Sequence, residues 1–189
     1  MNILIVGVGG QGTLLASRVL GRAKVDEGFD VKASEVHGMA QRGGSVVTFV
    51  KYGEKVYSPV IERGEADFIL AFEEMEAYRW LPYLKKGGKL IVNTQKIYPM
   101  PVIVGAAEYP NDIIEKIKGM GIDMFACDAL SVASAAGSEK SVNVVLLGVL
   151  SAAMGEDEER FLEAVKKTVP QKLLDVNIEA FTRGRSLCV

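Results

Sequence analysis

Cysteine and histidine are scarce in this sequence. Its 189 residues include two cysteines, Cys127 and Cys188, which stand far apart, and one histidine, His37. Because a four-cysteine iron–sulfur cluster needs four thiolates, this chain cannot hold one by itself, and a tetrahedral zinc site is not expected. Cys127 ends an apolar run and is expected to be a buried structural thiol. Cys188 is next to the C-terminal residue and is expected to lie on a frayed chain end. We therefore expect no redox centre and no metal site in this chain.

A surplus of positive charge and a long hydrophobic run are also missing. The formal net charge is −2, so a nucleic-acid surface has no electrostatic support. The longest apolar run, 142–154, is interrupted by Asn143, Gly148 and Ser151, and it is shorter than the roughly 20 residues that cross a bilayer. Met1 leads directly into the first apolar strand, so we expect no signal peptide. These features predict a cytoplasmic protein that binds neither nucleic acid nor membrane.

The chain does contain enough apolar residues for a sizeable core. Hydrophobic residues make up 49% of the sequence, which suits one compact domain spanning residues 1–189. Apolar strands alternate with helical patterns, which predicts an α/β, Rossmann-like fold with a mostly parallel open sheet, helices on both faces and a helical C-terminal part. After a first strand that begins at Asn2, strands are expected near 30–34, 45–50, 55–57, 66–71, 89–93 and 122–126, and helices near 13–23, 73–84, 112–118, 129–136, 141–154, 157–168 and 171–182.

Three of these expectations are specific enough to be checked individually. The strands 45–50 and 55–57 are joined by Tyr52-Gly-Glu54 and are predicted to form a hairpin. Lys86-Gly-Gly88 is predicted to close the helix 73–84. The helix 141–154 is apolar nearly all round, so it is expected to be the central core helix, or else to meet another subunit with part of its surface.

A glycine-rich turn follows the first strand. Gly7, Gly9 and Gly12 have the spacing G-x-G-x-x-G between a strand and a helix, where glycine permits a tight turn and a close approach of the backbone to a ligand. The unpaired N–H groups at the start of the helix favour a phosphate. The motif predicts a phosphate-compatible turn, although glycines are also needed there for packing alone.

A second glycine-rich segment, Glu35-Val-His-Gly-Met-Ala-Gln-Arg-Gly-Gly44, is expected to be a loop. In a dinucleotide-binding domain, an acidic residue about 20 residues beyond the glycines binds the ribose hydroxyls, and Glu35 stands at that place. A helix normally follows that acid, but here Gly38, Gly43 and Gly44 interrupt the segment. The glycine turn and Glu35 leave a stand-alone NAD(P)-binding dehydrogenase as an alternative. The loop after Glu35 and the lack of a second, substrate-binding domain weaken it. A nucleotide-sensing module is another alternative.

Together, Gly7-Val-Gly-Gly-Gln-Gly12 and the segment 35–44 resemble the gamma subunit, or gamma domain, of the 2-oxoacid:ferredoxin oxidoreductases. The resemblance covers nearly the whole chain. The short chain and the sequence Asn177-Ile-Glu-Ala-Phe181 are most similar to the indolepyruvate-specific members, although gamma subunits for pyruvate, 2-oxoglutarate and branched-chain 2-oxoacids share both motifs.

The resemblance implies a chain that is part of an enzyme and inactive alone. Such complexes oxidatively decarboxylate a 2-oxoacid to an acyl-coenzyme A and reduce ferredoxin. The family implies that thiamine diphosphate, Mg²⁺ and the iron–sulfur clusters lie in a larger partner subunit, which also passes electrons to ferredoxin. It further implies that the gamma domain lies over the active-site region and helps to receive coenzyme A. No residue of this chain is expected to be catalytic.

The resemblance gives site residues in both motifs. Gly9, Gly10, Gln11 and Gly12 match the family turn and are candidate backbone donors to a coenzyme A phosphate, with shaping of the turn as the equal alternative. Arg42 is a candidate bidentate partner for a phosphate or a partner carboxylate, with an ion pair inside the loop as its alternative.

Other polar residues have simpler interpretations. His37 is expected to be a hydrogen-bonded loop residue, and Met39 either an interface contact or a core filler. Glu73-Glu-Met-Glu76 is interpreted as the acidic first turn of a helix, where negative charge is favourable.

Overall fold

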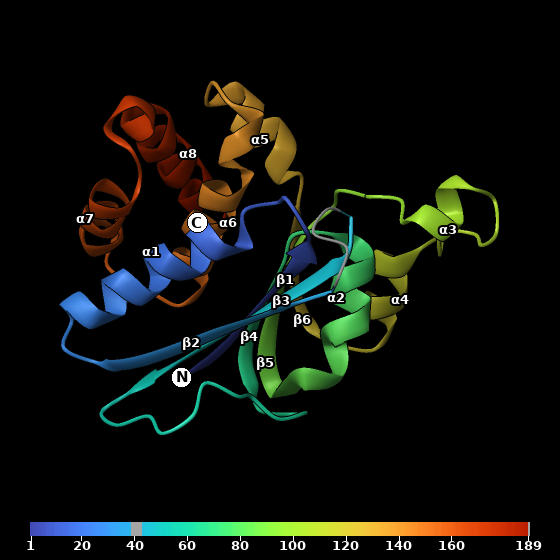
Figure 1. Ribbon diagram of the computed structural model, residues 1–189, viewed down its shortest axis with the longest axis horizontal. Coiled ribbons are helices and arrows are strands. Elements are labelled where there is room, and N and C mark those ends of the chain that lie inside the picture. The colour runs from blue at the N-terminus through green and yellow to red at the C-terminus, as the bar shows by residue number, and fades with distance from the viewer. Residues whose placement is uncertain (39–42, 189) are drawn as a thin grey trace.

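Six strands form one sheet in the order β2-β3-β1-β4-β5-β6 in the computed structural model, which describes residues 1–38 and 43–188 (Figure 1). The strands are β1 (Asn2–Val8), β2 (Asp30–His37), β3 (Ser45–Gly53), β4 (Ala66–Ala71), β5 (Leu84–Asn93) and β6 (Asp123–Cys127). Strand β3 pairs antiparallel with both β1 and β2, whereas the pairs β1–β4, β4–β5 and β5–β6 are parallel. The predicted α/β class with a mostly parallel sheet is therefore confirmed, with β3 running against the others.

Helices cover both faces of the sheet (Figure 1). Along β1, Ile3 and Ile5 belong to one core cluster and Leu4 and Val6 to the other, as the alternation of a strand with two covered faces requires. The helices of the first face are α1 (Thr13–Asp26), α5 (Ala129–Ala135), α6 (Val142–Ala153), α7 (Glu158–Thr168) and α8 (Leu174–Ser186); those of the second are α2 (Glu74–Trp80) and α4 (Ile113–Gly119). The four-residue helix α3 (Met100–Ile103) lies on a segment that projects from the body, and short 3₁₀ turns occupy Leu81–Tyr83, Glu139–Ser141 and Gln171–Leu173.

The predicted hairpin between 45–50 and 55–57 is wrong. Both edges of β3 are occupied, because β1 pairs on one side and β2 on the other. No edge is left for a strand at 55–57. The backbone N–H of Val56 instead donates to Asp30 Oδ2 at 2.9 Å, and the side chain of Val56 is buried. The hairpin partner of β3 is β2. Because β2 continues to His37, the first three residues of the segment 35–44, which was expected to be a loop, belong to a strand.

The prediction that Lys86-Gly-Gly88 closes the helix 73–84 is also wrong. Helix α2 ends at Trp80, and Pro82 lies in the 3₁₀ turn that follows. Proline has no N–H to continue a helical ladder. Lys86, Gly87 and Gly88 then belong to the first part of β5, where the register against β4 shifts between Ala66 and Phe68.

The apolar helix α6 is the central helix of the first face, as predicted. Its residues from Val142 to Ser151 are all buried, and α8 crosses it closely. A Cβ atom at Gly148 would lie 2.2 Å from Phe181 O, and one at Gly184 would lie 2.0 Å from Val145 O. The two helix backbones therefore touch at a pair of positions where only glycine fits.

We expect Gly148→Ala to destabilise the protein by about 2–3 kcal/mol, because the new methyl group must push α8 away from α6. Urea unfolding measures the change. Gly21→Ala is the matched control, because it too lies inside a helix but its Cβ would meet Val31 at an ordinary 3.8 Å. The control should be neutral or gain up to about 1 kcal/mol. Equal unfolding midpoints for both variants would contradict the close helix crossing.

Candidate functional site

The carboxyl ends of the central strands β1, β4 and β5 meet at one edge of the sheet. In open α/β sheets, this is the edge at which ligands bind. Strand β1 leads there into the turn Gly9–Gly12, β4 into Phe72 and Glu73, and β5 into Thr94 and Gln95. The glycine turn predicted from the sequence therefore lies where the topology places a site.

Two glycines of the turn have left-handed backbone conformations. Gly10 has a φ of 103° and Gly12 a φ of 84°, and residues that have a side chain rarely adopt such angles. Gly12 is the N-cap of α1 and no side chain caps this helix. Within the described residues, no oxygen accepts a hydrogen bond from the N–H of Gly10 or Gly12. These two donors, together with the positive end of the α1 dipole, form the electropositive part of the turn.

The other two predicted donors are already used inside the protein. The Gly9 N–H donates to Gly44 O at 2.8 Å, and the Gln11 N–H donates to Val8 O at 3.1 Å. The first bond ties the turn to the residue that precedes β3, and the second closes the turn on itself. Gly9 and Gln11 thus shape the turn through their N–H groups.

The side chain of Gln11 holds the turn against the neighbouring strands. Its Oε1 accepts from the Val8 N–H at 2.8 Å, and its Nε2 donates to Phe72 O at 2.9 Å and to Gln95 Oε1 at 3.2 Å. The amide is therefore engaged with the ends of β1, β4 and β5. Its hydrogen bonds fix where the donors of Gly10 and Gly12 stand.

Asn93 completes this network from the end of β5. It is fully buried, its Nδ2 donates to Phe72 O at 3.1 Å, and its Oδ1 accepts from the Ala129 N–H at 3.1 Å. The last bond reaches the first residue of α5. Sequence reasoning missed Asn93, although a polar residue that ends an apolar strand is a usable signal.

Two clefts lie on either side of the glycine turn. One, of about 330 Å³, is lined by the turn together with Thr13, Leu14, Glu35, His37 and Val46. The other, of about 460 Å³, is lined by the turn together with Gln95, Leu130, Glu139, Lys140 and Val142. Lys140 brings a positive charge to the second cleft. It follows α5 in the sequence, and no motif singled it out.

Glu35 lines the first cleft, but its place in the sheet order differs from that of the acid in a dinucleotide-binding domain. Its strand β2 is separated from β1 by β3, whereas the acid of that fold follows a strand next to the glycine turn. The Glu35 carboxylate instead accepts from Thr48 Oγ1 on β3 at 3.2 Å. His37 is exposed, and its Nδ1 lies 3.3 Å from Gly38 O, consistent with the predicted hydrogen-bonded histidine. Arg42 and Met39 lie outside the described residues.

Glu73 is the N-cap of α2, at the start of the helix that the acidic sequence predicted, and it also contacts two other segments. Its buried carboxylate caps α2 by accepting from the Glu76 N–H at 2.9 Å. The same carboxylate accepts from the Ile97 N–H at 3.2 Å and from the Tyr109 hydroxyl. Burial and the neighbouring Glu73 raise the pKa of Tyr109 above its usual range, so the hydroxyl stays protonated and donates. Glu73 thereby anchors both ends of the segment that carries α3.

Glu74 is a buried carboxyl group with one weak partner. Its residue is 6% exposed, and Lys96 Nζ lies 3.8 Å from its Oε2. Burial raises the pKa of Glu74 above its ordinary value, and the attraction of Lys96 offsets only part of that effect. Sequence reasoning assigned Glu74 to the acidic first turn of a helix, which it is, but could not show its burial, because the burial arises from the tertiary structure.

The cysteines are both partly buried. Burial raises the pKa of Cys127 to about 12, which disfavours the nucleophilic thiolate. Cys188 was expected to be frayed, but it packs against the first core cluster. Within the described residues, no group of three or more His, Cys, Asp and Glu side chains is arranged to hold a metal ion. In the same part of the chain, no helix has the length and apolar character of a membrane span.

The fold and the edge described above define a Rossmann-like α/β protein with a phosphate-compatible turn at the carboxyl end of β1. The sequence matches the family model described as pyruvate ferredoxin/flavodoxin oxidoreductase over residues 2–187. The chain belongs to this family, which confirms the resemblance seen in the two glycine motifs.

Individual relatives agree with this assignment. Indolepyruvate oxidoreductase subunit IorB of Thermococcus kodakarensis is 45% identical over 188 residues, covering 97% of this chain and 93% of the relative. The same fold occurs in the pyruvate oxidoreductase subunit PORC of Thermotoga maritima, with a TM-score of 0.75, 24% identity, and 98% and 95% of the two chains covered.

A longer chain also contains this fold. The 2-oxoglutarate:ferredoxin oxidoreductase of Magnetococcus marinus, solved with 2-oxoglutarate, coenzyme A and succinyl-CoA, matches with a TM-score of 0.75 and 21% identity. The match covers all of the present chain and 31% of that longer one. The stand-alone dehydrogenase and sensing alternatives are not supported by these matches.

We expect Glu74→Gln to stabilise the protein at neutral pH, because it removes a charge that burial disfavours. The raised pKa means that the folded state binds this proton more tightly than the unfolded state, so the charge penalty is complete above the folded pKa. The gain should shrink as the pH falls and vanish below the ordinary value of 4.5. Urea midpoints measured from pH 4 to pH 8 provide the test.

The exposed residue Glu54 supplies the control, since Glu54→Gln removes a charge that remains in water. A Glu74→Gln variant that is no more stable than the parent at neutral pH would show that Lys96 compensates the buried carboxylate fully.

Proposed function

We propose that this chain is the non-redox subunit of a thiamine diphosphate-dependent 2-oxoacid:ferredoxin oxidoreductase that is inactive without its partner. The observation that carries the proposal is the family match over residues 2–187, with 45% identity to an indolepyruvate oxidoreductase subunit along nearly its whole length. The complex oxidatively decarboxylates indolepyruvate, or another aryl or branched 2-oxoacid, to an acyl-coenzyme A. Residues 1–189 act in it as one gamma-type domain, in the cytoplasm.

The family implies the division of labour, and the side chains of this chain support it. A larger partner subunit holds thiamine diphosphate, Mg²⁺ and the iron–sulfur clusters, and it passes electrons to ferredoxin. This chain has two cysteines, both partly buried, and cannot supply the four thiolates of a cluster. Its contribution is therefore to bind and orient, and no residue of it is assigned a catalytic step.

The proposed ligand of the glycine turn is a phosphate group of coenzyme A. The Gly10 and Gly12 N–H groups, at the positive end of α1, are suited to a phosphate, and Gly9 and Gln11 hold them in place. Lys140 lines the adjoining cleft and supplies a positive charge that would attract the phosphate. When bound, coenzyme A supplies the thiol that accepts the acyl group. The chain would hold its phosphate end at the partner's active site.

Arg42 is proposed as a second anion partner on sequence grounds. In the sequence it precedes Gly43 and Gly44, and Gly44 O accepts a hydrogen bond from the N–H of Gly9 in the glycine turn. A guanidinium there would contact a coenzyme A phosphate or a carboxylate of the partner.

We expect the purified chain to be colourless and without turnover, and to gain coenzyme A-dependent ferredoxin reduction with indolepyruvate when the larger subunit is added. Visible iron–sulfur absorbance, or turnover of the chain alone, would contradict the proposal. Calorimetric titration with NADH provides a separate check. Tight binding of NADH by the isolated chain would favour a dehydrogenase.

We expect Lys140→Met to raise the coenzyme A concentration needed for half-maximal activity of the reconstituted complex by about threefold to tenfold, since about 1 kcal/mol of charge attraction is lost. Arg42→Ala should act in the same direction, and Arg42→Lys should restore only part of the loss. The control is Lys172→Met, which removes an exposed lysine on the 3₁₀ turn before α8. If the Lys140 and Lys172 variants titrate alike, Lys140 does not contact coenzyme A.

A further inference from the structure

A segment whose middle part is apolar and without charge projects from the carboxyl edge of the sheet. We call residues 94–110 the apolar arm. Between Lys96 and Glu108, its eleven residues from Ile97 to Ala107 contain no charged side chain. The arm connects β5 to α4 and carries α3, and it extends beyond the two helices of its face (Figure 1). A surface segment of this length usually contains charges that keep it in water.

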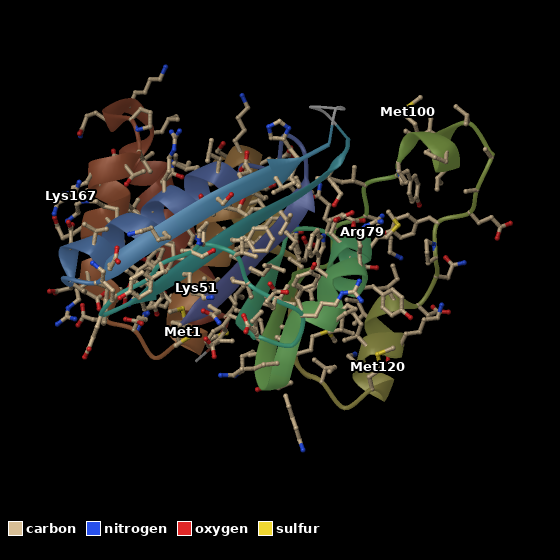
Figure 2. All side chains as sticks on the ribbon, turned by 60° about the horizontal axis from the view of Figure 1, so that its bottom comes forward. Met1, Lys51, Arg79, Met100, Met120 and Lys167 are labelled. Atoms are coloured by element: carbon tan, nitrogen blue, oxygen red, sulfur yellow. The ribbon has the colours of Figure 1, made fainter. Side chains whose placement is uncertain are left out.

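Large apolar side chains of the arm are exposed. Met100 is 66% exposed, Ile103 63% and Val104 65%, and Tyr98 is 54% exposed. Figure 2 shows Met100 on the outside of the arm, away from Arg79 on α2 and Met120 after α4. Single exposed apolar residues are common, but several large ones on one projection are typical of an interaction surface.

The arm is held in one shape before any partner arrives. Glu73 accepts hydrogen bonds from Ile97 near one end and Tyr109 near the other, and the rings of Tyr98 and Tyr109 lie 5.2 Å apart. Inside the arm, the Ala106 N–H donates to Pro101 O at 2.8 Å and the Val104 N–H to Met100 O at 3.0 Å. A preformed surface loses little entropy when it binds.

The base of the arm is continuous with the proposed coenzyme A site. Gln95, the second residue of the arm, accepts a hydrogen bond from Gln11 at 3.2 Å and lines the cleft that contains Lys140. A protein that covers the arm therefore also approaches the glycine turn. The chain that supplies the thiamine diphosphate chemistry must reach the same edge, because the thiol of coenzyme A has to meet the acyl group there.

We propose that the apolar arm is a docking element for the larger subunit of the complex, and that Met100, Ile103 and Val104 enter an apolar surface on it. This inference rests on the proposed function. It agrees with the longer Magnetococcus marinus chain, in which this fold is covalently part of a larger enzyme polypeptide. A second copy of the present chain is the competing occupant.

The test uses the double variant Ile103→Asp/Val104→Asp in the full chain, co-expressed and titrated with the larger subunit. Both side chains are exposed, so the isolated variant should unfold at the parent's urea midpoint. Burying two carboxylates in an apolar contact should weaken association about a hundredfold or more. The matched control is Val60→Asp, at a residue 51% exposed in the loop before β4, at the opposite edge of the sheet.

Biolayer interferometry gives the affinities, and sedimentation velocity gives the state of each isolated chain. Loss of association in the double variant, with parent-like association of Val60→Asp, supports the docking element. Parent-like affinity of the double variant overturns it and leaves the proposed function standing. If the double variant loses self-association but still binds the larger subunit, the arm contacts a second copy of this chain, and the proposed docking to the larger subunit is wrong. If the parent chain itself does not bind the larger subunit, both the docking element and the proposed function are wrong.

Discussion

The Phe72 carbonyl oxygen is a shared acceptor on which the carboxyl edge of the sheet depends. It receives hydrogen bonds from Gln11 at 2.9 Å and from Asn93 at 3.1 Å, so one atom after β4 joins the ends of β1 and β5. Asn93 also accepts from the first residue of α5, and Gln11 also accepts from Val8. Two amides that share an acceptor in this way, Asn93 buried and Gln11 half-buried, fix a single arrangement, since each broken bond would leave a polar group unpaired away from water. The positions of the glycine turn, the Lys140 cleft and the base of the apolar arm all follow from this network.

Much of the fold could be predicted because local patterns and tertiary structure agree. Strands buried on both faces gave continuous apolar runs at β1, β4 and β5, and an all-apolar helix proved to be the covered helix α6. The errors arose where pairing decided the outcome. Residues 55–57 have the composition of a strand, but β1 and β2 occupy both edges of β3. The Lys86-Gly-Gly88 segment has the composition of a helix end, but α2 ends at Trp80 and the 3₁₀ turn at Tyr83. Strand β5 begins at Leu84, which pairs with Ala66 of β4.

The candidate site could be predicted only in part for the same reason. The spacing of the glycines located the turn, but it could not show that the N–H groups of Gly9 and Gln11 are used internally. Nor could it show that those of Gly10 and Gly12 have no acceptor among the residues that the structure describes. Asn93, Glu73 and Lys140 come from three separate parts of the chain, and the sheet order brings them to one edge. Glu35 has the sequence position of a ribose-binding acid, but β3 lies between its strand and β1, and its carboxylate is hydrogen bonded to Thr48. Arg42 lies outside the described residues and stays a prediction.

The proposed division of the enzyme assigns this chain binding and orientation, with redox chemistry in the partner. In this arrangement a coenzyme A phosphate lies on the Gly10 and Gly12 N–H groups while the larger subunit covers the same edge. An electron cryomicroscopy structure of the reconstituted complex with coenzyme A would test this. We expect phosphate density within hydrogen-bond distance of these two N–H groups, roughly 2.7–3.2 Å, beside the partner's active site. Coenzyme A bound wholly by the larger subunit, with the glycine turn facing solvent, would contradict it.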